Sequence, residues 1–317
     1  MRKKSVSYAK YGYIFCIPFG LAFLIFSLYP IFYTGAISIS DFKGVNARTF
    51  QILKEPLDNF IYVLGNKSFR RALGNTAILW LVNFIPQILL AMLLTVWFTN
   101  VQTKVRAQGT FKILLYMPNI ITAATVAMLF GQLFAYPQGP INSIFLMLGM
   151  EKVEFLRSPT VARGIVAFIQ FWMWYGSTMI VLIAGVLGIS PSLFEAAAVD
   201  GANGFQTFFS VTLPGLRTIL LYTLITSMIG GLQMFDIPQL FLLGGPDHAT
   251  ETVSVYIYNQ AFMGGRQYNV AAAASMIMFA VTAILSGVLF YIMRDRDASK
   301  FKKEQRARKK LMKGASI

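Results

Sequence analysis

Residues 161–187 read VARGIVAFIQFWMWYGSTMIVLIAGVL, and residues 188–217 continue as GISPSLFEAAAVDGANGFQTFFSVTLPGLR. The first part is an almost uninterrupted apolar run. It exceeds the about 20 residues that a helix needs to cross the ~30 Å hydrocarbon core of a bilayer. The second part is more polar, and another apolar run follows it. The pattern predicts two membrane-spanning helices joined by a structured loop.

Apolar runs of this length recur along the chain. Six stretches qualify as spans: 11–37, 72–98, 113–135, 161–187, 219–243 and 270–293. Hydrophobic residues make up 56% of the chain and charged residues 13%, against about 25% charged in soluble domains. We therefore expect an all-α, polytopic membrane bundle of six helices over residues 11–293, flanked by a tail at 1–10 and a basic tail at 294–317.

The first apolar run could also be a secretory signal peptide, because three basic residues precede it. Its apolar core is much longer than the 7–15 residues of a signal sequence, so we interpret it as a retained helix. Several spans are interrupted by Pro or Gly, at Pro86, Pro118, Gly230-Gly231 and Pro238. Such breaks are tolerated in a membrane only where protein or a water-filled cavity satisfies the freed backbone groups. They suggest a transport path, although kinked packing without function is a close alternative.

The net charge of +15 is concentrated at the chain ends, with ten of the 28 Lys and Arg residues in the last 24 residues. With both termini inside, 18 basic residues fall on the cytoplasmic side and 10 on the outer side. This bias predicts a multi-pass protein of a bacterial or archaeal inner membrane with cytoplasmic termini. Contact of the basic tail with anionic lipid is expected, rather than binding of nucleic acid.

Cys16 is the single cysteine and His248 the single histidine. An intrachain disulfide is therefore impossible, and a zinc site or a Ser-His-Asp triad lacks its components. The sequence also lacks the G-x-x-x-x-G-K-[ST] loop that binds nucleotide phosphates. We expect no metal, no catalytic residue and no ATP hydrolysis on this chain.

The loop at residues 190–217 predicts two short helices joined by a tight turn. Ser190 can cap the first helix, and Gly201 can end it in a left-handed conformation. Asn203 can cap the second, which we expect to stop at Pro214. Residues at three- and four-residue spacing give that helix one apolar face. They are Phe205, Phe208, Phe209 and Val211.

The motif Glu195-Ala196-Ala197, then Gly201, then Val211-Thr212-Leu213-Pro214 resembles the EAA loop of binding-protein-dependent ABC importer permeases. Only Val211 departs from the pattern, in place of Ile. The chain also resembles the maltose-permease-like sugar subfamily in Phe235-Asp236, in Gly244-Gly245-Pro246 and in Thr250-Glu251-Thr252. An ordinary interfacial hairpin is the alternative interpretation of the loop.

The resemblance implies a type I ABC importer permease that works by alternating access. It would pair with a second permease and with two ATPase subunits that bind ATP and Mg, and it would receive substrate from an extracytoplasmic solute-binding protein. The EAA loop would contact the ATPase. The residues implied in this coupling are Glu195, Ala196, Ala197, Asp200, Gly201, Phe205, Phe208, Leu213 and Pro214.

Trp172 and Trp174 are expected near mid-membrane beside polar residues, where aromatic faces could stack on sugar rings. Packing of the two rings against another helix is the alternative. By the resemblance, the fourth and fifth spans hold the positions at which the maltose permease touches its sugar. Gly231 and Met234 replace asparagines there, so we expect a different carbohydrate. The candidate pathway residues are Trp172, Met173, Trp174, Tyr175, Ser177, Ser227, Gly231, Gln233, Met234 and Asp236.

Asp236 is the one acid inside a span. A headgroup-level or helix-capping role competes with a role in the substrate path. Rival functions are an ABC permease for another solute, a self-contained secondary transporter and a membrane-embedded hydrolase. Anionic solutes are disfavoured because no Lys or Arg lies deep in a span, and embedded ion-coordinating groups or repeats typical of secondary transporters are not seen.

Overall fold

The computed structural model describes residues 9–44, 51–100 and 106–293. These residues form helices and connecting loops, with one isolated bridge between Ser40 and Ile52. The all-α prediction is confirmed. The basic tail at 294–317 and most of the tail at 1–10 lie outside the described residues.

Five described helices are long and apolar enough to cross a bilayer: Tyr11–Ser38, Lys67–Thr99, Pro159–Leu187, Arg217–Leu242 and Tyr268–Ile292. The third predicted span is not one straight helix. It consists of Gln108–Ile120 and Ala123–Leu133, which meet at 90°. Counting this bent pair as one span gives six.

The break between the two helices lies after Pro118, which has no backbone N–H to donate. Met117 before it keeps helical backbone angles, so the direction of the chain changes later, at Ile121. The chain passes there through a 3-10 turn, η2 (Met117–Ile120), and then an extended Ile121. Thr122 starts the next helix, because its hydroxyl accepts a hydrogen bond from the Thr125 N–H at 3.3 Å.

The chain divides into two compact units, which are described separately. The first unit contains residues up to Leu73 together with Val253–Ala280. Its elements are α1 (Ala9–Phe23), η1 (Leu24–Leu28), α2 (Tyr29–Ser38), α3 (Asp58–Gly65), the start of α4 (Lys67–Thr99), α14 (Val253–Phe262) and the first half of α15 (Tyr268–Met293), whose second half belongs to the other unit.

A buried amide pair holds the first unit together. Asn59 donates from Nδ2 to the carbonyls of Ser38 and Ser40, each at 2.9 Å. Its Oδ1 accepts from Asn269 Nδ2 at 2.8 Å. Buried polar side chains need such partners, and these bonds fix the end of α2 against α3 and α15.

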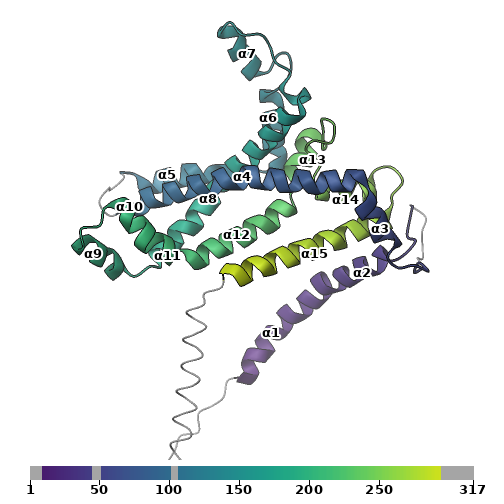
Figure 1. The fold of residues 1–317 in the computed structure, drawn as a ribbon, viewed down its shortest axis with the longest axis horizontal. Coiled ribbons are helices and arrows are strands. Elements are labelled where there is room, and N and C mark those ends of the chain that lie inside the picture. The colour runs from purple at the N-terminus through teal and green to yellow at the C-terminus, as the bar shows by residue number, and fades with distance from the viewer. Residues whose placement is uncertain (1–8, 45–50, 101–105, 294–317) are drawn as a thin grey trace, which may run out of the picture. The chain divides into compact units, whose positions relative to one another are not determined.

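The second unit contains Gly74–Thr252 and the chain from Val281 onwards. Its helices, besides most of α4, are α5 (Gln108–Tyr116), α6 (Ala123–Leu133), α7 (Pro140–Met147), η3 (Phe155–Arg157), α8 (Pro159–Leu187), α9 (Pro191–Val199), α10 (Gly204–Thr207), η4 (Phe208–Thr212), α11 (Leu213–Gly215), α12 (Arg217–Leu232) and α13 (Asp236–Leu242). Helix α8 is central: it packs against α5, η2, α12 and α13. Figure 1 shows α6 and α13 side by side and α9, α10 and α11 grouped at the far end of α8.

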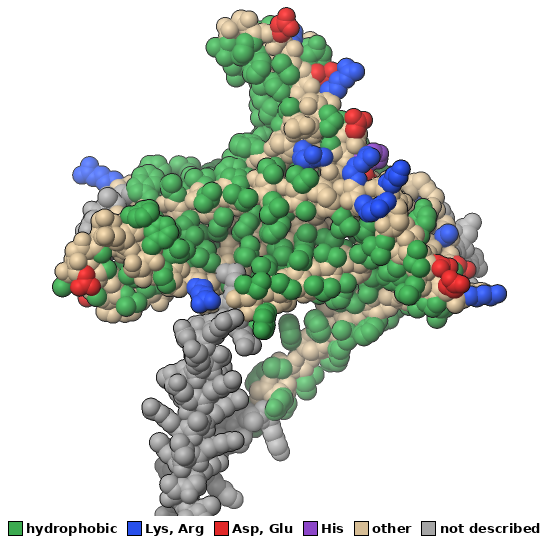
Figure 2. Space-filling model, in the orientation of Figure 1, with side chains coloured by type: hydrophobic (Ala, Val, Ile, Leu, Met, Phe, Trp, Pro, Cys, Tyr) green, Lys and Arg blue, Asp and Glu red, His purple; other side chains and the backbone are tan. Residues whose placement is uncertain are grey.

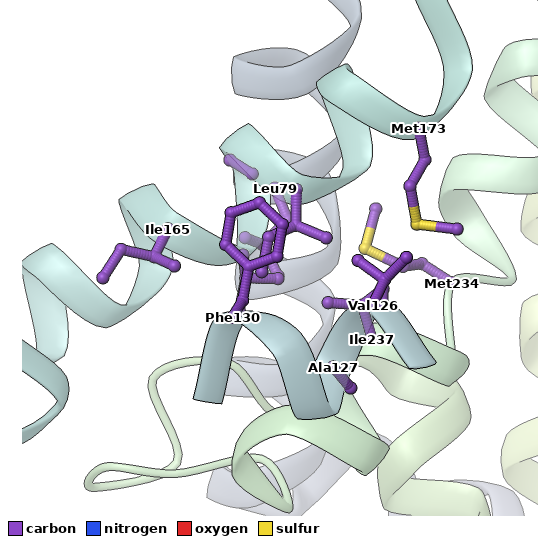
Figure 3. Packing of buried hydrophobic residues seen from close by; sticks show 11 residues of the cluster. Leu79, Val126, Ala127, Phe130, Ile165, Met173, Met234 and Ile237 are labelled. Atoms are coloured by element: carbon purple, nitrogen blue, oxygen red, sulfur yellow. The ribbon is translucent and has the colours of Figure 1, made fainter. Parts of the chain in front are cut away.

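The core of the second unit is formed where α4, α6, α8 and α13 meet. Figure 3 shows Met173 of α8 near Met234, with Val126 and Ile237 beside them. All four are buried. This cluster fixes the start of α13 against α6 and α8, and it therefore positions the break between α12 and α13.

The surface fits an apolar solvent. Hydrophobic side chains dominate the face along α4, and the charged side chains lie mainly toward helix ends and loops (Figure 2). Many large apolar side chains of α4 are exposed, including Leu89 and Leu93. Exposing so large an apolar area to water is unfavourable, so this face is suited to contact with lipid.

Candidate substrate cavity and ATPase-coupling loop

The second unit contains a cavity of about 490 Å³ between α4, α8, α12 and the break before α13. Helix α8 contributes Gln170, Met173, Trp174, Ser177, Thr178 and Val181. These positions recur at three- and four-residue spacing, so they form one face of the helix. One face of α8 therefore forms one wall of the cavity.

That period also separates the aromatic residues that the sequence groups together. Trp174 is half-exposed and lines the cavity. Trp172 does not line it; its ring packs edge-to-face on Phe130, 5.7 Å between centroids. Tyr175 is buried and packs with Phe171 at 5.7 Å. Successive helix residues point about 100° apart, so the four residues 172–175 cannot all face one cavity.

The polar lining on α4 is held in place by hydrogen bonds to α8 and within α4. Gln87 of α4 donates from Nε2 to Thr178 Oγ1 at 2.7 Å. Asn83, one turn earlier, donates to the Leu79 carbonyl at 2.8 Å. Both amides are buried and line the cavity. Gln87 thus links α4 to α8, whereas Asn83 bonds within α4, and both residues supply polar groups to the cavity.

On α12, a glycine makes room for an aromatic ring from α4. A Cβ on Gly231 would lie 2.6 Å from Trp80 Cγ, closer than non-bonded atoms approach. The Trp80 indole N–H donates to Ser227 Oγ at 3.4 Å. Gly231 and Ser227 both line the cavity. Trp80 therefore packs against one residue of the cavity wall, Gly231, and donates a hydrogen bond to another, Ser227.

The break between α12 and α13 completes the lining with Gln233, Met234 and Asp236. Met234 is buried, whereas Gln233 and Asp236 are exposed. Asp236 is the first residue of α13. The structure thus brings together eight of the ten candidate pathway residues and leaves out Trp172 and Tyr175.

Sequence reasoning missed part of the cavity wall on α12. Tyr222, Thr226 and Gly230 also line it, and they lie at four-residue spacing. A stripe of polar and small residues at that spacing in an apolar helix is a visible signal. Trp80 gave no such signal, because its role depends on contact with a glycine 151 positions away in the chain.

A hydrogen-bonded loop follows α13 and is anchored to α4 and α8. Asn75 donates to the carbonyls of His248 and Glu251, at 2.7 and 3.0 Å. Arg163 donates to the Asn75 side chain and to the Ala249 carbonyl, each at 3.0 Å. Within this loop, His248 Nδ1 lies 2.8 Å from the buried carboxylate of Glu251. His248 is thus exposed but paired.

The far end of the same loop is fixed to the cavity wall. Thr252 Oγ1 donates to the Met234 carbonyl at 2.6 Å. The loop therefore connects the beginnings of α4 and α8 with the break that contains Asp236.

The 190–217 loop forms the predicted pair of short helices. Helix α9 ends in a Schellman motif, because Ala202 N–H donates to the Ala197 carbonyl and Gly201 N–H to the Ala198 carbonyl. Gly201 has φ +71°, in the left-handed region, as predicted. Asn203 caps α10 in a capping box with Gln206, with both reciprocal bonds at 2.9 Å.

Two local predictions about this loop are wrong. The Ser190 hydroxyl does not cap α9; it pairs with the Ser192 hydroxyl at 2.8 Å. Pro214 does not stop the second helix either. It lies in the first turn of α11, where its missing N–H costs nothing, and the chain continues into α12 at Arg217.

The 190–217 loop presents apolar side chains to its surroundings. Val199 is 88% exposed and Phe205 73% exposed, values that a monomer in water would rarely keep together on one short segment. Phe208 is half-buried and packs edge-to-face on Phe209, 4.9 Å between centroids. Of the other predicted coupling residues, those that are exposed are Glu195, Ala196, Asp200, Gly201 and Pro214, and those that are half-buried are Ala197 and Leu213. Glu195 and Phe208 also line a groove of about 350 Å³ shared with the end of α4.

Comparison with known proteins supplies the family. Residues 60–303 match the binding-protein-dependent transport system inner membrane component family. The lactose transport system permease protein LacF of Rhizobium radiobacter is 30% identical over 289 residues, covering 90% of this chain and 94% of LacF. The trehalose/maltose transport system permease protein MalF of Thermococcus litoralis is 27% identical over 285 residues, covering 90% and 93%.

A solved bacterial ABC transporter involved in the import of the acidic polysaccharide alginate has the same fold, with a TM-score of 0.76 and 24% identity over 89% of this chain and 94% of the other. The resemblance stated from the sequence is confirmed, and the chain is a multi-pass membrane transport subunit, not an enzyme. It belongs to the family of binding-protein-dependent transport system inner membrane components, the permeases of ABC importers.

Proposed function

We propose that this chain is the permease of an ATP-driven carbohydrate importer and that its substrate passes through the α8–α12 cavity. The observation that carries the proposal is the composition of that cavity. The Trp174 ring lies among amides and hydroxyls that include Gln170, Ser177 and Thr226. An aromatic face stacks on the C–H face of a sugar ring, and uncharged polar groups recognise its hydroxyls. Relatives named as permeases for lactose and for trehalose/maltose support a sugar substrate.

We propose further that the 190–217 loop couples the cavity to ATP hydrolysis on two partner ATPase subunits, which would hold ATP and Mg. Exposed Val199 and Phe205 supply apolar contact area, and Glu195 supplies a carboxylate for an Arg or Lys of the partner. The capped, hydrogen-bonded turn at Gly201 makes the loop stiff enough to transmit movement. Alternating access then requires a second permease, which completes the path.

The expected setting is an inner membrane with both termini in the cytoplasm, supported by the excess of basic residues on that side. A solute-binding protein would deliver the sugar from outside. A solved alginate transporter in complex with a pentasaccharide-bound periplasmic protein supports such a partner.

The test is reconstitution of the chain with its second permease and ATPases in liposomes. A thermal-shift screen of saccharides against the cognate binding protein first identifies the sugar. Uptake of that sugar is expected only with both ATP and the binding protein. Uptake driven by an ion gradient without the ATPases would instead indicate a secondary transporter.

A further inference from the structure

Asp236 stands apart among the residues of the α8–α12 cavity. It is the only charged side chain among the described residues that line the cavity, which are otherwise apolar or carry amides and hydroxyls. It is exposed and lies at the first position of α13. The wall of the cavity therefore has one negative charge and no basic group among these residues.

As the first residue of α13, Asp236 gains some stability from the helix dipole, but its side chain has no specific partner. Within the described ranges, no ion pair and no hydrogen bond engages the Asp236 side chain. Its backbone position is fixed independently, because the neighbouring Ile237 is buried in the core cluster and Thr252 holds the Met234 carbonyl. Contacts of other residues therefore hold the break, and the interaction with the helix dipole is the structural contribution that the acid itself makes.

A single charge on the cavity wall affects the concentration of charged solutes inside the cavity. Low-dielectric helix walls focus the field of a charge into the space between them. A cleft lined by one sign of charge raises the local concentration of oppositely charged solutes and lowers that of like-charged ones. Ionisable groups at membrane depth are costly, which makes a functional role the default expectation.

We infer that Asp236 sets the charge preference of the pathway, admitting neutral and cationic saccharides, such as amino sugars, and rejecting uronic acids. The inference rests on the proposed function, because it assumes that the cavity is the sugar path. The two carboxylate oxygens accept hydrogen bonds from sugar hydroxyls or from an ammonium group. A uronate would meet the same oxygens without a compensating cation.

The experiment measures the potential inside the cavity and does not depend on transport. The chain has one cysteine, Cys16, so Cys16→Ser gives a cysteine-free background into which Thr226→Cys places a thiol on the cavity wall. Labelling rates with a cationic and an anionic methanethiosulfonate are compared in the full complex in nanodiscs. We expect the cationic reagent to react faster by roughly tenfold, after correction for the intrinsic rates.

Adding Asp236→Asn should reduce this ratio to near unity, since it removes the charge and keeps the shape. Glu151→Gln removes the same charge from the exposed loop before α8 and should leave the ratio unchanged. A thiol at Ser192→Cys, outside the cavity, should show no dependence on Asp236. An unchanged ratio at Thr226→Cys in the Asp236→Asn variant would overturn the inference.

A second measurement addresses the saccharide itself. Three disaccharides of one shape, cellobiose, the glucosamine dimer chitobiose and cellobiuronic acid, are tested for protection of the Thr226→Cys thiol against a small neutral reagent. We expect protection in the order cationic, neutral, anionic, and loss of that order in Asp236→Asn. Stronger protection by the uronate in the native protein contradicts the inference. Failure of ATP-driven sugar uptake would instead contradict the proposed function, whatever the labelling ratio.

Discussion

At the scale of single residues, the contact between Gly231 and Trp80 shapes the cavity most directly. The indole occupies the space of a side chain at position 231 and donates its N–H to Ser227. The adjacent Gly230 has open space where a Cβ would be added, with no atom within 4 Å. Of these two neighbouring glycines, packing therefore requires a glycine only at position 231.

We predict that Gly231→Ala lowers the thermal stability of the purified complex, because Trp80 must move; overpacking of this kind costs about 1–3 kcal/mol. Gly230→Ala should leave stability unchanged or raise it, since Ala is the better helix former. Melting temperatures in detergent or nanodiscs measure both. In a Trp80→Ala background the cost of Gly231→Ala should largely disappear, and equal costs in the two backgrounds would contradict the packing argument.

At the scale of elements, the two cap sites of the 190–217 loop are not equivalent. Asn203 makes a reciprocal capping box, whereas the Ser190 hydroxyl pairs with Ser192. We predict that Asn203→Ala destabilises α10 by about 1 kcal/mol and that Ser190→Ala has little effect. Limited proteolysis of the full-length chain, followed by mapping of cuts within 190–217, measures the difference. Equal protection in the two variants would argue against the box.

The elements also show what a sequence can and cannot predict. Long apolar runs predicted the spans, and Gly201 with Asn203 predicted the turn, because these signals are local. The 90° bend after Pro118 was not predicted, because a proline marks a break but not its angle, which depends on how α6 packs against α13. The assignment of Trp172 to the cavity was wrong for the same reason. The sequence places Trp172 and Trp174 in similar surroundings, and only the orientation of α8 shows that Trp174 alone of the two lines the cavity.

At the scale of the whole molecule, transport requires that ATP hydrolysis on another chain moves this one. Glu195 is exposed on α9, where a partner can reach it. We predict that Glu195→Lys leaves membrane insertion and expression intact but strongly reduces ATP-driven uptake, because a like charge would face the partner's basic group.

Glu154→Lys is the matched control for charge reversal. Glu154 pairs with Arg157 in the exposed segment before α8, far from α9 along the chain. Its reversal should leave the ATPase stimulation by substrate intact, whereas Glu195→Lys should abolish it. Normal coupling in Glu195→Lys at equal expression would remove the main support for the ATPase contact.

The anchored segment between α13 and Thr252 carries a thermodynamic consequence. Asn75 and Arg163 hold one part of it, and Thr252 holds the Met234 carbonyl in the cavity wall. A protein that binds this segment and shifts it must change the affinity of the cavity for its occupant. Reciprocity then demands that an occupied cavity change the affinity for that protein by the same factor. Binding of that protein and occupancy of the cavity would thus be thermodynamically linked.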